Sequence, residues 1–403
     1  MGVCGFYNFF SGATKTKYVS ELKGSMVAVD LSGVLMRYGM GIRNQGDDKK
    51  NNKGDIISHL YAIVRYTTSL TEKGILPLYV FDGKTTSNKI SLAQRKSVKD
   101  QSMERCKQIV DKNSPEYIKY FKRSYRLRRS DIEQCKALLE LMGIPFIHAP
   151  EEADSQCAAL AYMFPKTVSG VITDDSDVLV FGGPKIYKDF DVKNTLMTEI
   201  SYNTVLDLFM KKINFIRREL NLTPESYNYG FLKNKLREFC ILLGSDYSRP
   251  LMTRNAVYDN HDLLKIFIEN NMNVETLMSN ISKYESESDR RIFNRSSNVL
   301  EDFYRANDAY ICSKVYKPCI SCTRMSIPKY NELEQFLVET MDYGDDDVTK
   351  LFGLLRRTYD IFSNMKLLKD HDRTDAFSSF STYQFKFCKR NSMESTRRPI
   401  MVH

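Results

Sequence analysis

Carboxylate side chains follow four short apolar segments of this sequence, close to the point where each segment ends. Met26–Asp30 and Leu76–Asp82 each finish in an aspartate, and carboxylates spaced i,i+2 come soon after Pro145–His148 and Val168–Thr173. Helical patterns separate these segments, so we expect parallel strands whose carboxyl ends share one edge of a sheet. The side chains expected to meet there are Asp30, Asp82, Glu152, Asp154, Asp175 and Asp177.

This clustering of carboxylates indicates a site for divalent cations. One aspartate at a strand end is usually a helix cap or a turn residue, but six at successive strand ends are hard to explain structurally. Clustered carboxylates repel one another by several kcal/mol in a partly dry site, and cations would offset that cost. All-oxygen ligands suit Mg²⁺ or Mn²⁺. Two such ions about 4 Å apart can stabilise both reacting oxygens of a phosphodiester displacement.

The excess positive charge of the chain is concentrated in a single segment. The net charge is +9, yet residues 84–130 alone hold 14 Lys/Arg against 4 Asp/Glu, a local balance of +10. A solvated helical face is the simplest explanation, but so uneven a distribution favours a polyanionic partner. Aromatic residues interleave with the charges, and single-stranded nucleic acid stacks on such side chains. A carboxylate cluster and a basic segment together predict a metal-dependent nuclease.

Composition excludes several other classes of protein. The 403 residues are 42% hydrophobic and 27% charged, which suffices for a folded core and rules out a collagen-like or wholly disordered chain. No apolar run has the length of a membrane span. Nine scattered cysteines and an N-terminus without the signal-peptide layout lead us to expect a soluble, intracellular protein.

The strand and helix signals divide the chain into two regions. Up to about residue 250 they alternate, which predicts an α/β domain with a parallel sheet. Helical patterns then run from Phe231 to about Phe362. The polar segment Arg43–Gly54 is expected to be a mobile loop, and Ser130 with Glu133 to form a capping box for a helix over Asp131–Met142.

At the level of motifs the chain resembles the flap endonuclease family, the XPG-like structure-specific nucleases. The matching motifs occur in family order: MGVCGF, VAVDLSG, YVFDGK, LMGIPFIHAPEEADSQCAAL, ITDDSDVLVFG and CILLGSDY. The resemblance implies a PIN-like α/β core, a parallel twisted sheet flanked by helices, with a helical arch inserted. The implied regions are the N-terminal part of the core (1–83), the basic arch (84–130), the internal part of the core (131–250) and a helical DNA-binding and closing region (251–363). The polar, Ser-rich composition of residues 364–403 predicts a disordered tail.

The resemblance also implies roles for individual residues. Asp30, Asp82, Glu152 and Asp154 would hold one Mg²⁺ (or Mn²⁺), and Asp175, Asp177 and a seventh carboxylate, Asp246, the second. On the arch, Lys89 and Arg95 match residues that orient the phosphate, with Lys96 as the ungapped alternative to Arg95. The implied DNA contacts are Lys122 and Arg123 on the second arch helix, Gly2 near the scissile phosphate and Gly244 near the duplex backbone.

Three departures from the family pattern stand out. The glycine-containing hairpin after the last aspartate is replaced by SRPLMTRNAV, where Arg249 and Arg254 are the candidate substitutes. The family's stacking tyrosine aligns with Met36, two residues before Tyr38. The tail has no recognisable sliding-clamp motif, which argues against that partner.

The expected activity is Mg²⁺-dependent hydrolysis of branched DNA at 5′ flaps, in replication, repair or recombination. A four-way-junction resolvase or a 5′ exonuclease with the same chemistry is an alternative, as is a DNA-binding protein whose site has decayed. We expect a monomer, or a dimer on junctions, acting on DNA in the nucleus of a cell or of the host of a large DNA virus.

Overall fold

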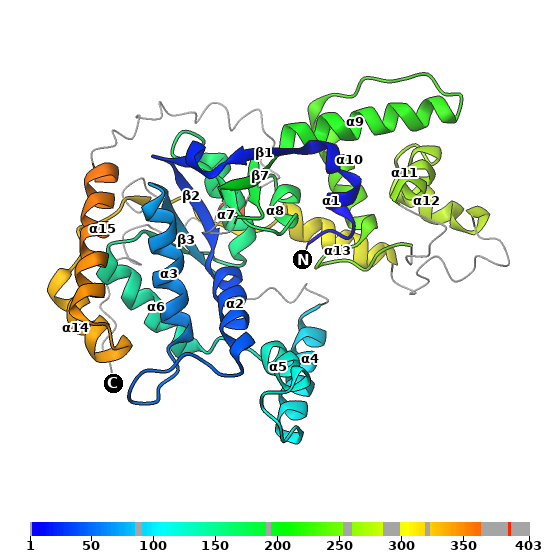
Figure 1. The fold of residues 1–403 in the computed structure, drawn as a ribbon. Helices are drawn as coiled ribbons and strands as arrows, with labels where there is room; N and C mark the ends of the chain where they lie inside the picture. The colour runs from blue at the N-terminus through cyan, green and yellow to red at the C-terminus, as the bar shows by residue number, and fades with distance from the viewer. Residues whose placement is uncertain are drawn as a thin grey trace.

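A seven-stranded sheet forms the centre of the molecule (Figure 1). This computed structural model describes residues 2–84, 91–190, 195–252, 260–284, 299–318, 323–363 and 386–387. In sheet order the strands are β1 (Thr14–Tyr18), β7 (Leu196–Ser201), β6 (Lys185–Lys188), β5 (Val168–Ile172), β2 (Met26–Asp30), β3 (Leu76–Phe81) and β4 (Phe146–His148). The strands from β6 to β4 are parallel, whereas β7 pairs antiparallel with β6 and with β1.

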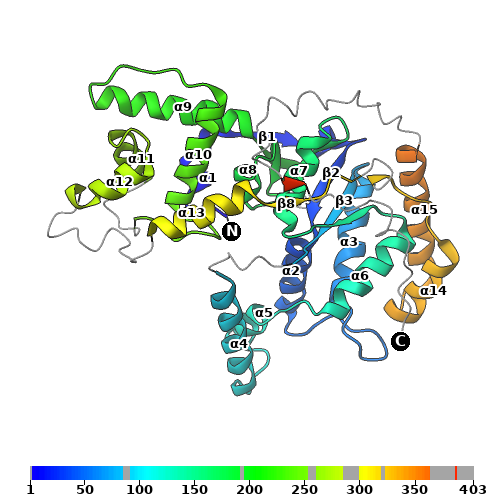
Figure 2. The same cartoon turned by 180° about the vertical axis from the view of Figure 1, so that it is seen from behind.

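The helices of the core cover both faces of this sheet. Their bounds are α1 (Phe6–Phe9), α2 (Leu31–Ile42), α3 (Ser58–Glu72), α6 (Arg129–Met142), α7 (Ala153–Met163) and α8 (Asp177–Val180). Helices α2 and α3 pack on β3, and α7 packs on β2 and β5 from the opposite side, as Figures 1 and 2 show. Right-handed crossovers that run in opposite directions along a sheet require this arrangement.

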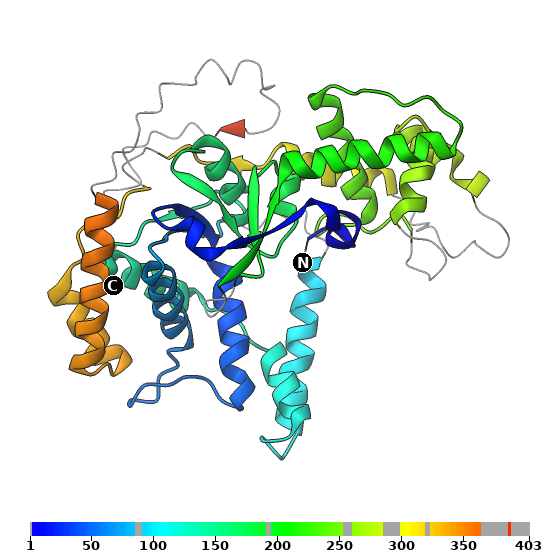
Figure 3. The same ribbon diagram turned by 45° about the horizontal axis from the view of Figure 1, so that its top comes forward.

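Two further groups of helices extend from the core. The basic segment forms α4 (Ser91–Gln108) and α5 (Pro115–Arg123), which stand away from the sheet beyond α2 (Figure 3). The second group is α9 (Tyr202–Glu219), α10 (Tyr229–Leu243), α11 (Asn260–Glu269), α12 (Val274–Asn280) and α13 (Val299–Ile311). At the opposite side of the molecule, α14 (Tyr330–Met341) packs on α6 and α15 (Asp345–Ser363) packs on α3 (Figure 1). The minor elements are the 3-10 turns Ser11–Ala13, Val19–Leu22, Arg43–Gln45 and Ile281–Tyr284 and the paired strands β8 (Lys314–Val315) and β9 (Lys386–Phe387).

The carboxyl ends of β2, β3, β4 and β5 lie at one edge of the sheet. β2 is followed by β3 on one side and has β5 on the other, so the topological switch point lies between β2 and β5. Strands β2 and β3, at the centre of the sheet, are almost continuously buried, as expected for parallel strands covered on two faces. The position at which ligands bind in such sheets therefore coincides with the strand ends that carry the carboxylates.

The four predicted strands and the α/β class are confirmed, but two local predictions are wrong. Helix α6 begins with Arg128 as its N-cap, not with a box of Ser130 and Glu133: the Asp131 carboxylate accepts the Arg128 backbone N–H at 2.9 Å. The segment Arg43–Gly54 has defined contacts, including a backbone bridge between Lys50 and Ile56.

The sequence patterns do not predict every element of the fold. Strands β1, β6 and β7 and the long helix α9 had no predicted counterpart. The expected disordered tail lies outside the described residues, apart from β9. In the described part of the chain, no helix combines the length and the apolar character that crossing a membrane requires.

Candidate active site

The first carboxylate, Asp30, ends β2 and caps helix α2. Its oxygens accept the backbone N–H of Ser32 at 2.9 Å and of Gly33 at 3.1 Å, so the strand end and the helix start are fixed together. Burial, followed by repulsion from Asp82 and Asp175, raises the pKa of Asp30 to about 8, despite these two hydrogen bonds. Three of the predicted ligands are therefore close enough to act on one another electrostatically.

The next carboxylates belong to two neighbouring segments, the end of β3 and the start of α7. Asp82 directly follows β3, and its Oδ1 accepts the backbone N–H of Ala153 at 3.0 Å. Glu152 is the N-cap position of α7 and Asp154 lies in its first turn. One turn further along, burial and then the nearby aspartates raise the pKa of the Cys157 thiol. Asp82 therefore lies against the start of α7, which carries Glu152 and Asp154, and acts electrostatically on Asp30.

The N-terminal segment lies directly against the last pair of strand-end carboxylates. The backbone N–H of Asp177 donates to Asp175 Oδ1 at 2.9 Å, and the N–H of Val3 donates to Ser176 Oγ at 2.9 Å. Gly2 has φ +85°, and a Cβ on it would lie 2.3 Å from Asp175 Oδ1. A side chain at this position would therefore collide with a predicted metal ligand.

The seventh predicted ligand, Asp246, lies in the turn after α10. This turn is tied to the N-terminal segment, because the N–H of Cys4 donates to the Gly244 carbonyl at 2.8 Å. Gly244 has φ +92°, and a Cβ there would lie 2.7 Å from the Pro250 nitrogen. The turn itself therefore requires a glycine, whatever Gly244 contributes to DNA contacts.

Two buried tyrosines donate hydrogen bonds to predicted ligands. The Tyr247 hydroxyl donates to Glu152 Oε2, and the Tyr310 hydroxyl donates to Asp177 Oδ1 at 3.0 Å. Burial raises the pKa of each phenol far above its ordinary value, and the negative charge of the partner carboxylate raises it further. Both therefore stay protonated donors. No signal in the sequence singles out Tyr310, which lies more than 130 positions from its partner and in no recognised motif.

Carboxylates that are not predicted ligands lie around the predicted site and form ion pairs with basic side chains. Three neighbouring basic residues pair with carboxylates outside the predicted ligand set: Arg37 with Asp174 at 2.6 Å, Lys188 with Asp189 at 2.7 Å and Lys314 with Glu151 at 3.4 Å. Across the described residues, no three His, Cys, Asp or Glu side chains already form a compact metal-binding group.

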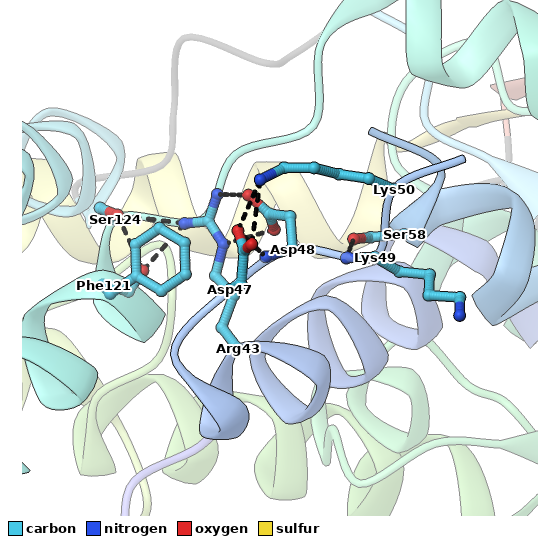
Figure 4. Close-up of polar contacts among 8 residues, drawn as sticks. All are labelled: Arg43, Asp47, Asp48, Lys49, Lys50, Ser58, Phe121 and Ser124. Carbon is cyan, nitrogen blue, oxygen red and sulfur yellow. Dashed lines mark hydrogen bonds and ion pairs between the residues drawn. The ribbon is translucent and has the colours of Figure 1, made fainter. Parts of the chain in front are cut away.

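The basic arch is joined to the core through one buried arginine. Arg43, at the end of α2, forms a two-point ion pair with Asp48, with Nε–Oδ1 at 2.8 Å and Nη2–Oδ2 at 2.9 Å (Figure 4). Its Nη1 also donates to the Phe121 carbonyl at 2.8 Å and to Ser124 Oγ at 3.1 Å, at the end of α5. The guanidinium lies over the rings of Phe121 and Tyr125, 4.1 and 4.9 Å from their centroids. The segment predicted to be mobile is therefore what holds the base of the arch.

Close packing at the base of the arch depends on a glycine in α2. A Cβ on Gly39 would lie 2.1 Å from the Tyr125 ring. The chain just after α5 therefore lies directly against α2, where its aromatic ring fills the space left by the missing side chain.

The predicted arch residues are only partly described. Lys96 and Arg123 are exposed and Lys122 is half-buried, on α4 and α5. Lys89 lies outside the described residues, and of Arg95 only its place on α4 is described. The first turn of α4 points toward the N-terminal segment in Figures 1 and 3. In the altered hairpin, Arg249 is exposed and Arg254 lies outside the described residues.

Curated relatives of the chain are flap endonucleases. Flap endonuclease 1 of Chlamydomonas reinhardtii is 36% identical over 251 residues, which cover 61% of this chain and 58% of the relative. Flap endonuclease 1 of Plasmodium vivax is 29% identical over 380 residues, 91% of this chain and 57% of the relative. The chain thus spans less than two thirds of the length of these relatives.

Solved structures share the fold at low sequence identity. The catalytic core of Rad2 in complex with DNA substrate has a TM-score of 0.56 at 22% identity, covering 88% of this chain and 100% of that one. Flap endonuclease-1 from Methanococcus jannaschii gives 0.56 at 22% identity, covering 86% and 96%. Human GEN1 in complex with Holliday junction DNA gives 0.55 at 17% identity, covering 89% and 78%.

Two family descriptions match the chain directly, one reaching into the arch and the other beginning after it. Residues 1–103 match the XPG N-terminal domain and residues 143–246 match the XPG I-region. Together they span just over half of the sequence and contain all seven predicted ligands. The chain belongs to the XPG family.

Proposed function

We propose that this chain is a structure-specific 5′ nuclease that hydrolyses phosphodiester bonds of branched DNA, 5′ flaps in particular. The observation that supports the proposal is that Asp30, Asp82 and Asp175, from three strand ends, are close enough to repel one another, with Gly2 directly against Asp175. The flap endonuclease relatives support the substrate class. Action on nuclear DNA, as a monomer, is part of the same proposal.

The chemistry of the donor set fits divalent cations. Every predicted ligand is a carboxylate, and hard cations such as Mg²⁺ and Mn²⁺ prefer oxygen donors. Repulsion from Asp82 and Asp175 contributes to the raised pKa of Asp30, and a bound cation would offset that repulsion. Asp30, Asp82, Glu152 and Asp154 would hold one ion and Asp175, Asp177 and Asp246 the other.

The residues of the chain would position the DNA and the ligands. When bound, two divalent ions stabilise charge on the reacting phosphate and make water more acidic. Gly2 leaves room for a phosphate beside Asp175, because it lacks a side chain. Lys89 and Arg95, assigned from the family resemblance, would neutralise the phosphate from the arch. The arch, residues 84–130, would thread the 5′ single strand, and residues 251–363 would contact the duplex.

Cleavage of a panel of end-labelled DNAs tests this proposal. The substrates are a 5′ flap, a single strand, a nicked duplex and a four-way junction, each with Mg²⁺, with Mn²⁺ and with chelator. We expect metal-dependent cuts at the base of the flap, and loss of those cuts in Asp82→Asn and Asp177→Asn. Asp189→Asn is the matched control, because Asp189 lies beside the cluster but outside the predicted ligand set.

Each result separates the proposal from its alternatives. If the protein cut the four-way junction in preference to the flap, it would be a resolvase. If it digested DNA stepwise from the 5′ end, it would be an exonuclease. Metal-independent DNA binding without cleavage of any substrate would leave only a DNA-binding protein. Unchanged cleavage by both ligand variants would overturn the assignment of the site.

A further inference from the structure

Helix α13 reaches the candidate active site from the far end of the chain. Its last turn carries Tyr310, which is 3% exposed and whose hydroxyl donates to Asp177 Oδ1 at 3.0 Å. The ring packs against Phe181 and Tyr247, with centroid separations of 4.9 and 5.0 Å. A residue of the C-terminal helical region is thus in direct contact with a predicted ligand of the nuclease core.

The chain after Tyr310 continues along the same group of carboxylates. The N–H of Lys314 donates to Glu151 Oε2 at 3.1 Å, next to the predicted ligand Glu152. Gln156, on α7, exchanges two hydrogen bonds with the backbone of Tyr316, at 2.7 and 3.0 Å. The segment 310–316 therefore holds α13 against both ligand-bearing segments, the start of α7 and the turn of Asp177.

Packing alone does not explain the hydroxyl group of Tyr310. The aromatic contacts need only a ring, which phenylalanine would supply. A buried hydroxyl must find a partner, and this one donates to a carboxylate oxygen of Asp177 and also bonds the side chain of Ser245. Donors that hold a ligating carboxylate from behind fix its orientation, and their loss weakens metal binding.

We propose that Tyr310 is a positioning residue for the metal site: its hydroxyl holds Asp177 Oδ1 and so orients the carboxylate toward the cation. This inference rests on the proposed function, in which Asp177 is a cation ligand. It also gives the C-terminal helical region a part in the chemistry, because Tyr310 lies on α13, which the Arg237 Nε to Asn307 Oδ1 hydrogen bond at 2.9 Å joins to α10.

Tyr310→Phe removes one oxygen atom and keeps the ring, so it is the decisive variant. Tyr304→Phe is the matched control: Tyr304 lies on the same helix, and its hydroxyl donates to a carboxylate, Glu275, that is far from the site in sequence and exposed at the surface. Mn²⁺ binding is measured by calorimetry without DNA. Flap-DNA affinity in chelator, kcat and KM across a Mg²⁺ titration, and thermal unfolding are measured alongside.

We expect Tyr310→Phe to weaken Mn²⁺ binding about 10-fold and to lower kcat at limiting Mg²⁺, with partial recovery at high Mg²⁺. DNA affinity, KM for DNA and the unfolding temperature should stay near those of the parent, and Tyr304→Phe should match the parent throughout. Parent-like Mn²⁺ binding by Tyr310→Phe, or an equal effect in Tyr304→Phe, would overturn the inference.

Asp177→Asn separates this inference from the function on which it depends. If Asp177→Asn loses Mn²⁺ affinity and cleavage while Tyr310→Phe behaves like the parent, the inference fails and the proposed site stands. If Asp177→Asn itself binds Mn²⁺ as the parent does, Asp177 is no ligand and the inference fails, whereas the proposed function fails only if Asp82→Asn also cleaves as the parent does.

Discussion

The candidate active site and the base of the arch treat buried charge in opposite ways. At the site, Asp30 is buried beside Asp82 and Asp175, all of the same sign, and its pKa rises to about 8. At the base of the arch, Arg43 and Asp48, with side chains 10% and 6% exposed, are of opposite sign and form a two-point ion pair. The site thus concentrates negative charge, whereas the arch base cancels charge within the protein.

This difference indicates which charges are structural and which belong to a function. A buried ion pair that satisfies itself stabilises a particular arrangement of chain segments, and removing one partner leaves an uncompensated charge. A set of like charges costs stability and is retained for what it binds. Substitutions in the two regions should therefore have opposite effects on stability.

The largest expected effect is that of Asp30→Asn. Asparagine has a single acceptor oxygen, so it keeps only one of the two hydrogen bonds from Ser32 and Gly33, but it removes a ligand charge and the repulsion from Asp82 and Asp175. We expect flap cleavage to fall about 1000-fold or more, while the metal-free protein becomes more stable by about 1 kcal/mol. Cleavage kinetics and urea unfolding in chelator measure the two effects, and a loss of stability would contradict the comparison.

Arg43→Met should act in the reverse direction. It leaves Asp48 buried without its partner and removes the donors to Phe121 and Ser124, so we expect a loss of about 3 kcal/mol in the free energy of unfolding. The double variant Arg43→Met with Asp48→Leu should recover most of that loss, because no lone charge remains. Urea unfolding of the parent and of the single and double variants checks this. If Arg43→Met were as stable as the parent, the ion pair would contribute nothing to stability.

Lys233 and Arg237, two buried positive side chains on α10, test whether burying like charges lowers stability for positive charges as it does for negative ones. Burial, and next Arg237, lowers the pKa of Lys233 to about 8. The folded protein then binds fewer protons than the unfolded chain between about pH 8 and 10.5, so this group adds stability as pH rises through that window. Lys233→Met should remove that rise and should stabilise the protein at pH 7 by about 2 kcal/mol. Unfolding curves of parent and variant at pH 7, 8, 9 and 10 give the difference in slope, and parallel curves would refute it.

The smallest effect should come from the neighbouring surface ion pair. Lys50 and Asp47 lie in the same segment as Asp48, at 2.9 Å, but their side chains are 44% and 68% exposed. Water and salt screen such a pair, so Lys50→Ala should change stability by less than about 0.5 kcal/mol. A change as large as that of Arg43→Met would mean that burial is not what separates the two pairs.

The amino-acid sequence by itself determined the α/β class, the four parallel strands and the carboxylates at their ends. These are local signals: an apolar run, an aspartate at its end, a glycine where a helix stops. The motif resemblance added Asp246 and the arch. Neither could show that Gly2 lies against Asp175, because that contact joins residues more than 170 positions apart.

Only the tertiary structure decided which partner each charged or polar side chain has. Arg43 and Asp48 sit in a polar segment that was expected to be mobile, yet packing beneath the arch buries them and makes their pairing a structural requirement. Tyr310 is one of 24 tyrosines in the chain, and the path of α13 places its hydroxyl on Asp177. Local patterning sets where strands and helices form, whereas burial and long-range packing set the electrostatic role of each side chain.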